Sequence, residues 1–177
     1  MELDGQLAAL RGAIRDVPDF PKPGIVFKDI TTLLRDEALF RRALDLMSVM
    51  CGDLAVDKVV AIESRGFILG GALALRLGAG FVPVRKPGKL PWKARRASYE
   101  LEYGSDSLEI HEDALKPGER ALVVDDVIAT GGTARAVGEL VAALGATVAA
   151  FAFLIELGFL DGRAKLAGSE IRSLIRY

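Results

Sequence analysis

The sequence predicts an α/β fold in which helices cover both faces of a central parallel sheet. Short apolar runs recur along the chain, and they have the pattern of strands that are buried on both faces. Stretches with apolar residues at helical spacing lie between these runs. Strands that alternate with helices favour parallel pairing through helical crossovers. The 177 residues contain no internal repeat and no dividing linker, so we expect a single domain over residues 1–177.

The first third of the chain is predicted to be mostly helical, with one proline-rich interruption. Leu3, Leu7, Leu10 and Ile14 have the spacing of an amphipathic helix. The segment Val17–Gly24 contains three prolines, which exclude helix and leave either a connector or a rigid wall of a site. After it we predict a short extended piece and a longer helix, at 25–30 and about 36–51.

The middle of the chain carries the first two core strands. Lys58–Ile62 runs into the polar turn Glu63-Ser64-Arg65-Gly66, and a helix rich in small residues follows to about Leu77. Phe81–Val84 is the next strand. It leads into Arg85–Arg96, which has six basic residues, two prolines and no periodicity, so we expect a mobile loop there.

The last part of the chain is predicted to form a hairpin and the remaining strands of the sheet. Gly104-Ser105-Asp106 reads as the hairpin turn between two extended runs. The apolar run Ala121–Val124 is a buried strand that ends at Asp125 and Asp126. The further predicted elements are a helix at 133–144, a strand at 146–155, a short helix near 160–166 and a strand at 171–175.

The stretch from Asp125 to Thr133 contains the strongest signal for a ligand. A Thr-Gly-Gly-Thr turn at 130–133 opens a helix, whose N-terminal N–H groups and positive dipole end bind phosphate well. The glycines allow close approach of the backbone, and the threonine hydroxyls add donors. The adjacent carboxylates would repel phosphate, but they accept hydrogen bonds from vicinal hydroxyls. A phosphate beside a diol indicates a ribose 5-phosphate site.

Ligands of parallel sheets bind beyond the carboxyl ends of the strands. The polar turns after Ile62, Val84 and Val124 should therefore converge, and the cations after Val84 could neutralise a second anion such as a diphosphate.

Composition limits the other functions and the location of the protein. A formal net charge of −1 argues against a general nucleic-acid or membrane binder. The single cysteine, Cys51, excludes an internal disulfide and favours a reducing compartment. The acidic start does not resemble a signal peptide, and no apolar run approaches the length of a membrane span. We therefore expect a cytoplasmic protein.

Five segments, in the order found here, resemble the signatures of the adenine phosphoribosyltransferases, members of the type I phosphoribosyltransferases. They are Pro18–Ile30, Glu63–Phe67, Arg85–Pro91, Ala97–Gly104 and Val124–Thr133. The resemblance implies a Rossmann-like sheet with a small N-terminal hood (about 1–34), a core (about 35–177) and a mobile loop or hairpin. It also implies Mg²⁺-dependent transfer of a phosphoribosyl group from phosphoribosyl diphosphate to adenine, which gives AMP and diphosphate. The family suggests a homodimer, and Mg²⁺ held by substrate and water rather than directly by the protein.

The resemblance also assigns roles to single residues. Asp125 and Asp126 would hold the ribose hydroxyls, and the 5-phosphate would lie against Ala129, Thr130, Gly131, Gly132 and Thr133. Glu63 and Ser64 would form the diphosphate loop, where the family often has a cis peptide, with Arg85, Lys86 and Lys89 as further contacts. For adenine, the implied contacts are Val26, Phe27, Leu157 and Arg65. Glu102 is the implied general base, although a glutamate at a strand end is by default only solvated.

Two alternatives remain. Relatives that act on 6-oxopurines usually carry Asp at the position of Ala129, and relatives of the xanthine enzymes tend to read Ala-Asn-Gly where this chain has Ala129-Thr130-Gly131. Both observations favour adenine over hypoxanthine, guanine or xanthine. A non-catalytic regulator that binds phosphoribosyl diphosphate would need a DNA-binding appendage, and only about fifteen residues precede the proline-rich segment. The lone His111 belongs to no motif and is expected to be structural.

Overall fold

The computed structural model describes residues 2–101 and 104–177, which form two compact units, Met1–Leu46 and Met47–Tyr177. The boundary between the units lies inside helix α3 (Glu37–Cys51).

The N-terminal unit contains helices α1 and α2, most of a third helix and a small antiparallel ribbon. Its elements are α1 (Glu2–Ala13), β1 (Arg15–Pro18), β2 (Val26–Asp29), α2 (Thr31–Leu34) and the first part of α3. Strand β1 pairs with β2, and the Phe20–Pro21 peptide bond in the connection between them is cis. Strand β1 was not predicted, because Pro18 within it favours a loop. Pro18 is tolerated because each strand of a two-stranded ribbon has one edge without a partner strand, and no N–H donor is needed on that edge.

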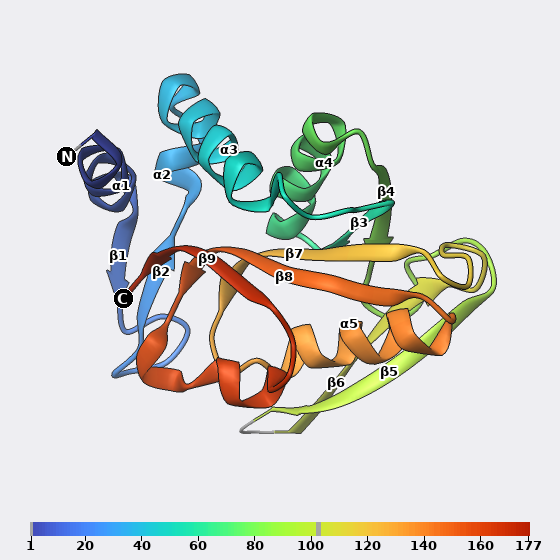
Figure 1. The fold of residues 1–177 in the computed structure, drawn as a ribbon. Coiled ribbons are helices and arrows are strands. Elements are labelled where there is room, and N and C mark those ends of the chain that lie inside the picture. Colours follow the sequence, from blue (N-terminus) through green and yellow to red (C-terminus); the bar gives the residue numbers. More distant parts are fainter. Residues whose placement is uncertain (1, 102–103) are drawn as a thin grey trace. The chain divides into compact units, whose positions relative to one another are not determined.

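The C-terminal unit is built on a five-stranded parallel sheet with the order β4-β3-β7-β8-β9. The strands of this sheet are β3 (Lys58–Ile62), β4 (Gly80–Val84), β7 (Arg120–Ile128), β8 (Thr147–Glu156) and β9 (Ile171–Arg176). Helix α4 (Arg65–Leu77) covers one face, and helix α5 (Gly132–Ala143) covers the other (Figure 1). Two short 3₁₀ helices, η1 (Gly158–Leu160) and η2 (Gly162–Leu166), connect β8 to β9. The prediction of an α/β fold with a central parallel sheet is confirmed.

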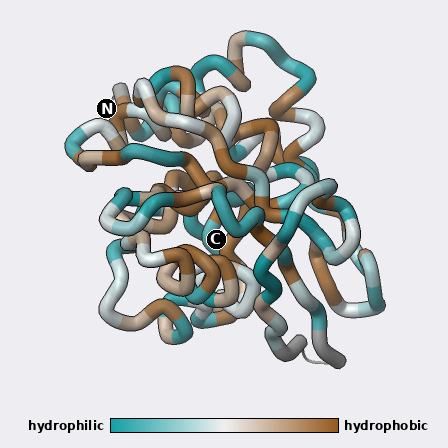
Figure 2. Tube along the Cα trace, turned by 90° about the vertical axis from the view of Figure 1, so that its right-hand side faces the viewer, coloured by the Kyte–Doolittle hydropathy of each residue, from teal (hydrophilic) through white to brown (hydrophobic). Residues whose placement is uncertain are grey.

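A long hairpin of β5 (Ala94–Leu101) and β6 (Gly104–His111) packs against α5. Both hydrophobic and hydrophilic residues occur along its two strands (Figure 2). Leu108 and Ile110 on β6 belong to the core cluster that also contains residues of the sheet and α5. The predicted turn at Gly104–Asp106 was wrong, since these residues already belong to β6. The strands are also longer than expected, because their backbone groups pair without interruption from Ala94↔His111 to Leu101↔Gly104.

Helix α4 lies unusually close to the sheet. A Cβ atom on Gly70 would lie 3.5 Å from Val59 Cγ1 and would overlap with the Cβ of Ala61. The small residues of α4 therefore allow its backbone to approach β3, which holds the N-terminus of the helix at the carboxyl end of the strand.

Candidate active site

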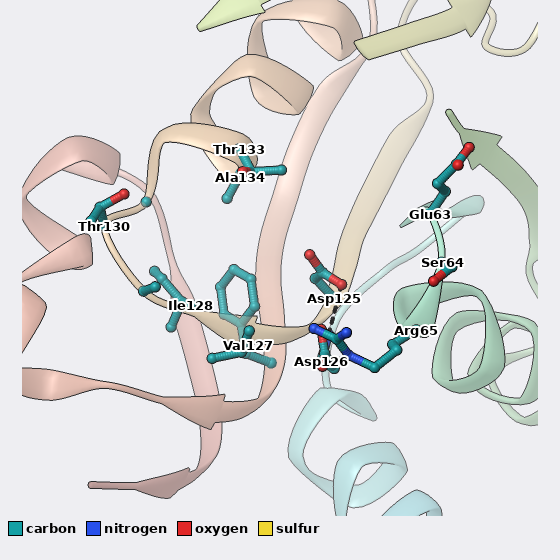
Figure 3. Close-up of a pocket in the computed structure, with 13 residues that line it drawn as sticks. Glu63, Ser64, Arg65, Asp125, Asp126, Val127, Ile128, Thr130, Thr133 and Ala134 are labelled. Carbon is teal, nitrogen blue, oxygen red and sulfur yellow. Dashed lines mark hydrogen bonds and ion pairs between the residues drawn. The ribbon is translucent and has the colours of Figure 1, made fainter. Parts of the chain in front are cut away.

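Two of the three polar turns that were predicted to converge, those after Ile62 and Val124, line one pocket of about 270 Å³ in the C-terminal unit, and the segment after Val84 does not line it. The pocket lies at the carboxyl ends of β3 and β7, as expected for a parallel sheet. Figure 3 shows these residues. The lining residues are Glu63, Ser64, Arg65, Asp125, Asp126, Val127, Ile128, Ala129, Thr130, Gly131, Thr133, Ala134 and Phe153.

The turn between β3 and α4 forms one wall of the pocket. The Glu63–Ser64 peptide bond is cis, as the resemblance implied. The next residues pack tightly against β7, because a Cβ atom on Gly66 would lie 2.9 Å from Asp125 Oδ1 and 3.0 Å from the carbonyl oxygen of Val124. Only glycine leaves room for the start of α4 to lie this close to the strand.

The two acids point to different partners. Strand β7 runs to Ile128 and does not end at Val124 as predicted, so Asp125 and Asp126 lie within it and their side chains alternate. Asp126 is only 3% exposed, and its carboxylate accepts a hydrogen bond from Arg65 Nε within an ion pair. The carboxylate of Asp125 points into the space between Glu63 and Thr133 (Figure 3). Asp125 is therefore the acid that faces a ligand in the pocket.

Burial raises the pKa of the Asp125 carboxyl well above its ordinary value, and the neighbouring Asp126 carboxylate raises it further. The backbone N–H of Asp126 donates to Asp125 Oδ1 at 2.8 Å and opposes this shift. Asp125 is thus poised to lose its proton more readily when positive charge or hydroxyl donors enter the pocket.

The loop from Ala129 to Gly131 and the start of α5 form the opposite wall. Gly131 is the N-cap residue of α5 and has φ 78°, a left-handed conformation that favours glycine. The N–H groups of the first helical turn have no acceptor within the helix and are available to an anion. Thr133 lies above Asp125, and Thr130 lies at the far side of the loop (Figure 3). This is the arrangement expected for a phosphate beside a diol.

The loop also packs against a segment that the sequence did not single out. A Cβ atom on Gly131 would lie 3.1 Å from the carbonyl carbon of Gly162 and closer still to its oxygen. A Cβ atom on Gly162 would lie 3.0 Å from the Gly131 nitrogen and would overlap with the carbonyl oxygen of Ala129. The two backbones therefore touch with no side chain between them.

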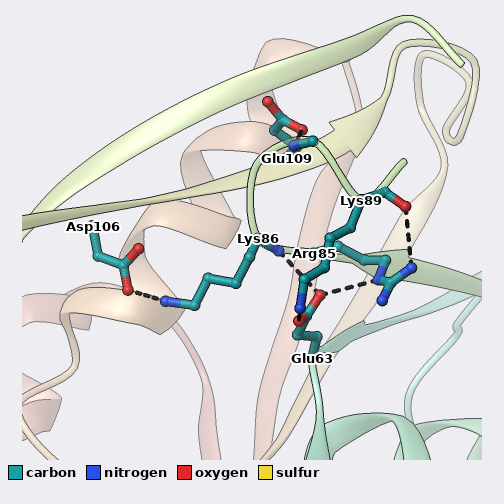
Figure 4. Close-up of polar contacts among 7 residues, drawn as sticks. Glu63, Arg85, Lys86, Lys89, Asp106 and Glu109 are labelled. Atoms are coloured by element: carbon teal, nitrogen blue, oxygen red, sulfur yellow. Dashed lines mark hydrogen bonds and ion pairs between the residues drawn. The ribbon is translucent and has the colours of Figure 1, made fainter. Parts of the chain in front are cut away.

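The basic residues after β4 do not line the pocket but gather around Glu63 (Figure 4). Arg85 Nε donates to Glu63 Oε2 at 3.0 Å, the backbone N–H of Lys86 donates to the same oxygen at 3.1 Å, and Lys89 Nζ donates to Oε1 at 2.5 Å. The side chain of Lys86 pairs with Asp106 on β6. Burial opposes the ionisation of Glu63, but the hydrogen bonds from Lys89, Lys86 and Arg85 lower its pKa. Glu63 thus holds two side-chain cations, Arg85 and Lys89, at one rim of the pocket.

The residues implied for adenine belong to both units of the chain. Leu157 follows β8, where its N–H donates to the carbonyl oxygen of Ile128 at 2.9 Å, and it does not line the pocket. Val26 and Phe27 lie on β2 in the N-terminal unit, and the ring of Phe27 meets that of Phe20 edge to face at 5.3 Å. Glu102, the implied general base, lies outside the described residues.

Phe153 was missed by the sequence reasoning and lines the pocket from β8. Phe153 lies in a continuous apolar run, which does not distinguish it from its neighbours. Its position at the pocket follows from the register of β7 and β8, in which it pairs with Asp125. Within residues 2–101 and 104–177 we find no cluster of His, Cys, Asp or Glu suited to a metal ion. The helices in the described ranges are too short or too polar to cross a membrane.

Comparison with known proteins finds similarity along nearly the whole chain. A family model for the phosphoribosyl transferase domain matches residues 30–169. The adenine phosphoribosyltransferase of Anaeromyxobacter sp. (strain Fw109-5) is 54% identical over 177 residues, which cover 100% of both chains. The crystal structure of adenine phosphoribosyltransferase from Thermoanaerobacter pseudethanolicus superposes with a TM-score of 0.95 at 51% identity, covering 97% of this chain and 99% of that chain. The Saccharomyces cerevisiae enzyme, complexed with D-2,5-dideoxy-2,5-imino-altritol 1,6-bisphosphate and adenine, superposes with a TM-score of 0.90 at 42% identity, covering 97% and 99%.

Proposed function

The chain belongs to the phosphoribosyl transferase family, and within it to the adenine phosphoribosyltransferases, and from this we propose its reaction. It transfers the 5-phosphoribosyl group of phosphoribosyl diphosphate to adenine and produces AMP and diphosphate. The observation that carries this proposal is the pocket in which a half-buried carboxylate, Asp125, faces the open start of a helix. A 5-phosphate on the helix start leaves the ribose hydroxyls beside that carboxylate.

The 5-phosphate binds to the loop and helix start that comprise Ala129, Thr130, Gly131, Gly132 and Thr133. Helix N–H groups and threonine hydroxyls donate hydrogen bonds to its oxygens. Asp125 accepts hydrogen bonds from the ribose, and Asp126 acts through Arg65, whose guanidinium it orients. As the bond from C1 to the leaving oxygen breaks, positive charge builds on the ribose ring and an ionised Asp125 stabilises it.

Negative charge develops on the leaving diphosphate, which would lie at the rim formed by Glu63, Ser64 and the basic segment after β4 (85–93). Arg85 and Lys89, which pair with Glu63, supply two cations at this rim, and Lys86 adds a third. Mg²⁺ would be carried by the diphosphate, the ribose hydroxyls and water, as the family resemblance implies. Oxygen donors of this kind are the ligands that Mg²⁺ prefers. When bound, Mg²⁺ neutralises charge on the leaving group.

Adenine would lie between Val26, Phe27 and Leu157, with Arg65 beside the ring, and Glu102 would take the proton that the ring loses. These assignments follow the family resemblance. Ala129 supports adenine over a 6-oxopurine, because those relatives usually carry an acid at this position.

The choice of base is tested by incubating the protein with phosphoribosyl diphosphate, Mg²⁺ and each purine base in turn. AMP should form far faster than IMP, GMP or XMP. Preference for hypoxanthine, guanine or xanthine would move the protein to another branch of the family. Tight binding of phosphoribosyl diphosphate with no turnover of any base would favour the regulator. Omission of Mg²⁺ should abolish turnover.

We further propose a homodimer in the cytoplasm. The family resemblance supports the dimer, and a mass near twice 18.9 kDa in sedimentation or light scattering is the expected result. The charged substrates support a cytoplasmic location, since such molecules do not cross membranes unaided, and the buried thiol of Cys51 suits a reducing compartment. Cell fractionation with a tagged chain tests the location.

A further inference from the structure

The end of β8 and the 3₁₀ helix η2 are joined by an ion pair between Glu156 and Arg163, which we call the clamp. Glu156, the last residue of β8, is only 3% exposed. Arg163 in η2 donates to both of its oxygens, with Nε to Oε1 at 2.8 Å and Nη2 to Oε2 at 2.7 Å. This bidentate pair fixes the direction as well as the distance of Arg163.

Further contacts hold the same carboxylate and the same guanidinium. The hydroxyl of Ser173 on β9 donates to Glu156 Oε2, and Arg176 Nε lies 3.4 Å from Oε1. Arg163 Nη1 donates to the carbonyl oxygen of Ile171 at 3.2 Å. The clamp therefore ties η2 to the ends of two strands of the sheet.

The residue before Arg163 is Gly162, which is buried and touches the phosphate loop. Its missing side chain leaves space for the carbonyl oxygen of Ala129 and for Ile128, whose Cγ1 would be 2.9 Å from a Cβ atom. On the other side of the contact, Gly131 presents its own backbone to the carbonyl of Gly162. In Figure 1 the segment from η1 to η2 lies beside the start of α5. Any shift of η2 therefore moves the loop.

We propose that Glu156, Arg163 and Gly162 are positioning residues that hold the 5-phosphate loop in its binding shape. The proposal rests on the proposed function, because it assumes that the loop at Ala129–Gly131 receives a phosphate. None of the three residues lines the pocket, so they act through the backbone of the loop. Their effect should fall on ligands that carry a 5-phosphate, and not on adenine.

The test compares Gly162→Ala and Arg163→Lys with two control variants. Arg172→Lys removes a comparable clamp, in which Arg172 on β9 pairs with Asp53 and Glu170 away from the pocket. Gly71→Ala adds a methyl group to a glycine with no atom within 4 Å of its ideal Cβ. For each variant we would measure the thermal midpoint, the KM for each substrate, and the Kd for ribose 5-phosphate by calorimetry.

Gly162→Ala should raise the KM for phosphoribosyl diphosphate and the Kd for ribose 5-phosphate about tenfold or more, because small displacements of positioning groups cost up to about 100-fold. The KM for adenine should stay within about twofold, and kcat should fall less than the affinity. Arg163→Lys keeps the charge but not the bidentate geometry, and should change the same constants in the same direction. Both controls should leave them unchanged.

Equal losses for ribose 5-phosphate and adenine, or unchanged affinity in both test variants, would overturn the proposal. If Gly162→Ala does not fold, Arg163→Lys and Glu156→Gln decide the question by the same constants. Wild-type protein that binds ribose 5-phosphate without making AMP would contradict the proposed function. The role of the clamp would then still be decided by the Kd for ribose 5-phosphate in the variants. Wild-type protein that does not bind ribose 5-phosphate would contradict both.

Discussion

Asp125 is placed where the folded chain tolerates a carboxylate poorly. It lies next to Asp126 in β7, its surroundings remove it from water, and its pKa is raised for both reasons. The buried Asp126 is paired with the partly exposed Arg65, whereas Asp125 faces the pocket. A group that serves a ligand in this way commonly costs stability in the empty protein.

We predict that Asp125→Asn raises the thermal midpoint at pH 7 and sharply lowers kcat/KM. Because the pKa of Asp125 in the folded state lies above the ordinary aspartate value of 3.8, its proton stabilises the fold fully below that pH. This contribution is lost as the pH rises through the folded-state pKa. Asparagine carries no charge and avoids this loss. The midpoints of variant and wild type should therefore diverge as the pH rises from 4 to 8 in thermal melts.

Asp126→Asn is the matched control for this prediction. It weakens the ion pair with Arg65, and the expected result is a lower thermal midpoint at pH 7. A fall in the midpoint of Asp125→Asn would contradict the account given for Asp125.

Single residues differ in how far the sequence reveals them. Asp125 and Glu63 were found because each directly follows an apolar run, and Thr133 because it ends the Thr-Gly-Gly-Thr turn that opens a helix. Phe153 and Gly162 were not, because an apolar residue in a strand and a glycine in a connection carry no chemical signal of their own. Both depend on register and on tertiary contact, which the sequence does not display.

At the scale of elements, the segment after β4 carries the cations proposed to contact diphosphate and is itself held by ion pairs and hydrogen bonds. It was expected to be a mobile loop. In the structure Arg85 and Lys89 pair with Glu63, and the N–H of Gly88 donates to Glu109 at 2.9 Å. Binding of a diphosphate at this rim would compete with Glu63 for the two cations. Mobility itself stays a prediction.

We predict that Lys89→Ala raises the KM for phosphoribosyl diphosphate about tenfold, because a cation at the diphosphate rim is lost. The thermal midpoint should change little, since the Lys89 side chain is 49% exposed and exposed ion pairs contribute little to stability. Steady-state kinetics at two salt concentrations measure the effect, which should shrink in high salt.

Lys93→Ala changes an exposed lysine of the same segment that does not line the pocket, and it should behave like wild type. An unchanged KM in Lys89→Ala would show that this segment only covers the surface.

Element type was predictable here, and element ends were not. The periodicity of β3, α4 and α5 identified them, whereas β7 was predicted to end at Val124 because aspartate is disfavoured in strands. It continues to Ile128 because β8 pairs with it along the whole length, up to Ile128↔Glu156. The 3₁₀ helices were expected as one short helix, and Asp161, with φ 48°, interrupts them.

At the scale of the whole molecule, ligand binding should add directly to stability. AMP occupies the phosphate loop and the ribose site in the proposed function, and a ligand at 100 times its Kd stabilises the folded state by about 2.7 kcal/mol. For a chain of this size that corresponds to a rise of about 5–10 °C in the thermal midpoint. Adenosine, which lacks the phosphate, should raise it much less at the same concentration. Equal shifts would show that the loop contributes little.

The parallel topology of the sheet determines how this protein has to fold. Strands β3 and β7 are neighbours in the sheet, yet β4 and the hairpin of β5 and β6 lie between them in the chain. Pairing them closes a long loop, which makes the step slow and dependent on distant contacts. Glu63 follows β3, and Asp125 follows Val124, the last residue of β7 that pairs with β3. The ligand pocket therefore forms only when the centre of the sheet has formed. During refolding, recovery of AMP binding should therefore coincide with the slowest phase of tertiary structure, and no nascent chain that ends before β7 should bind it.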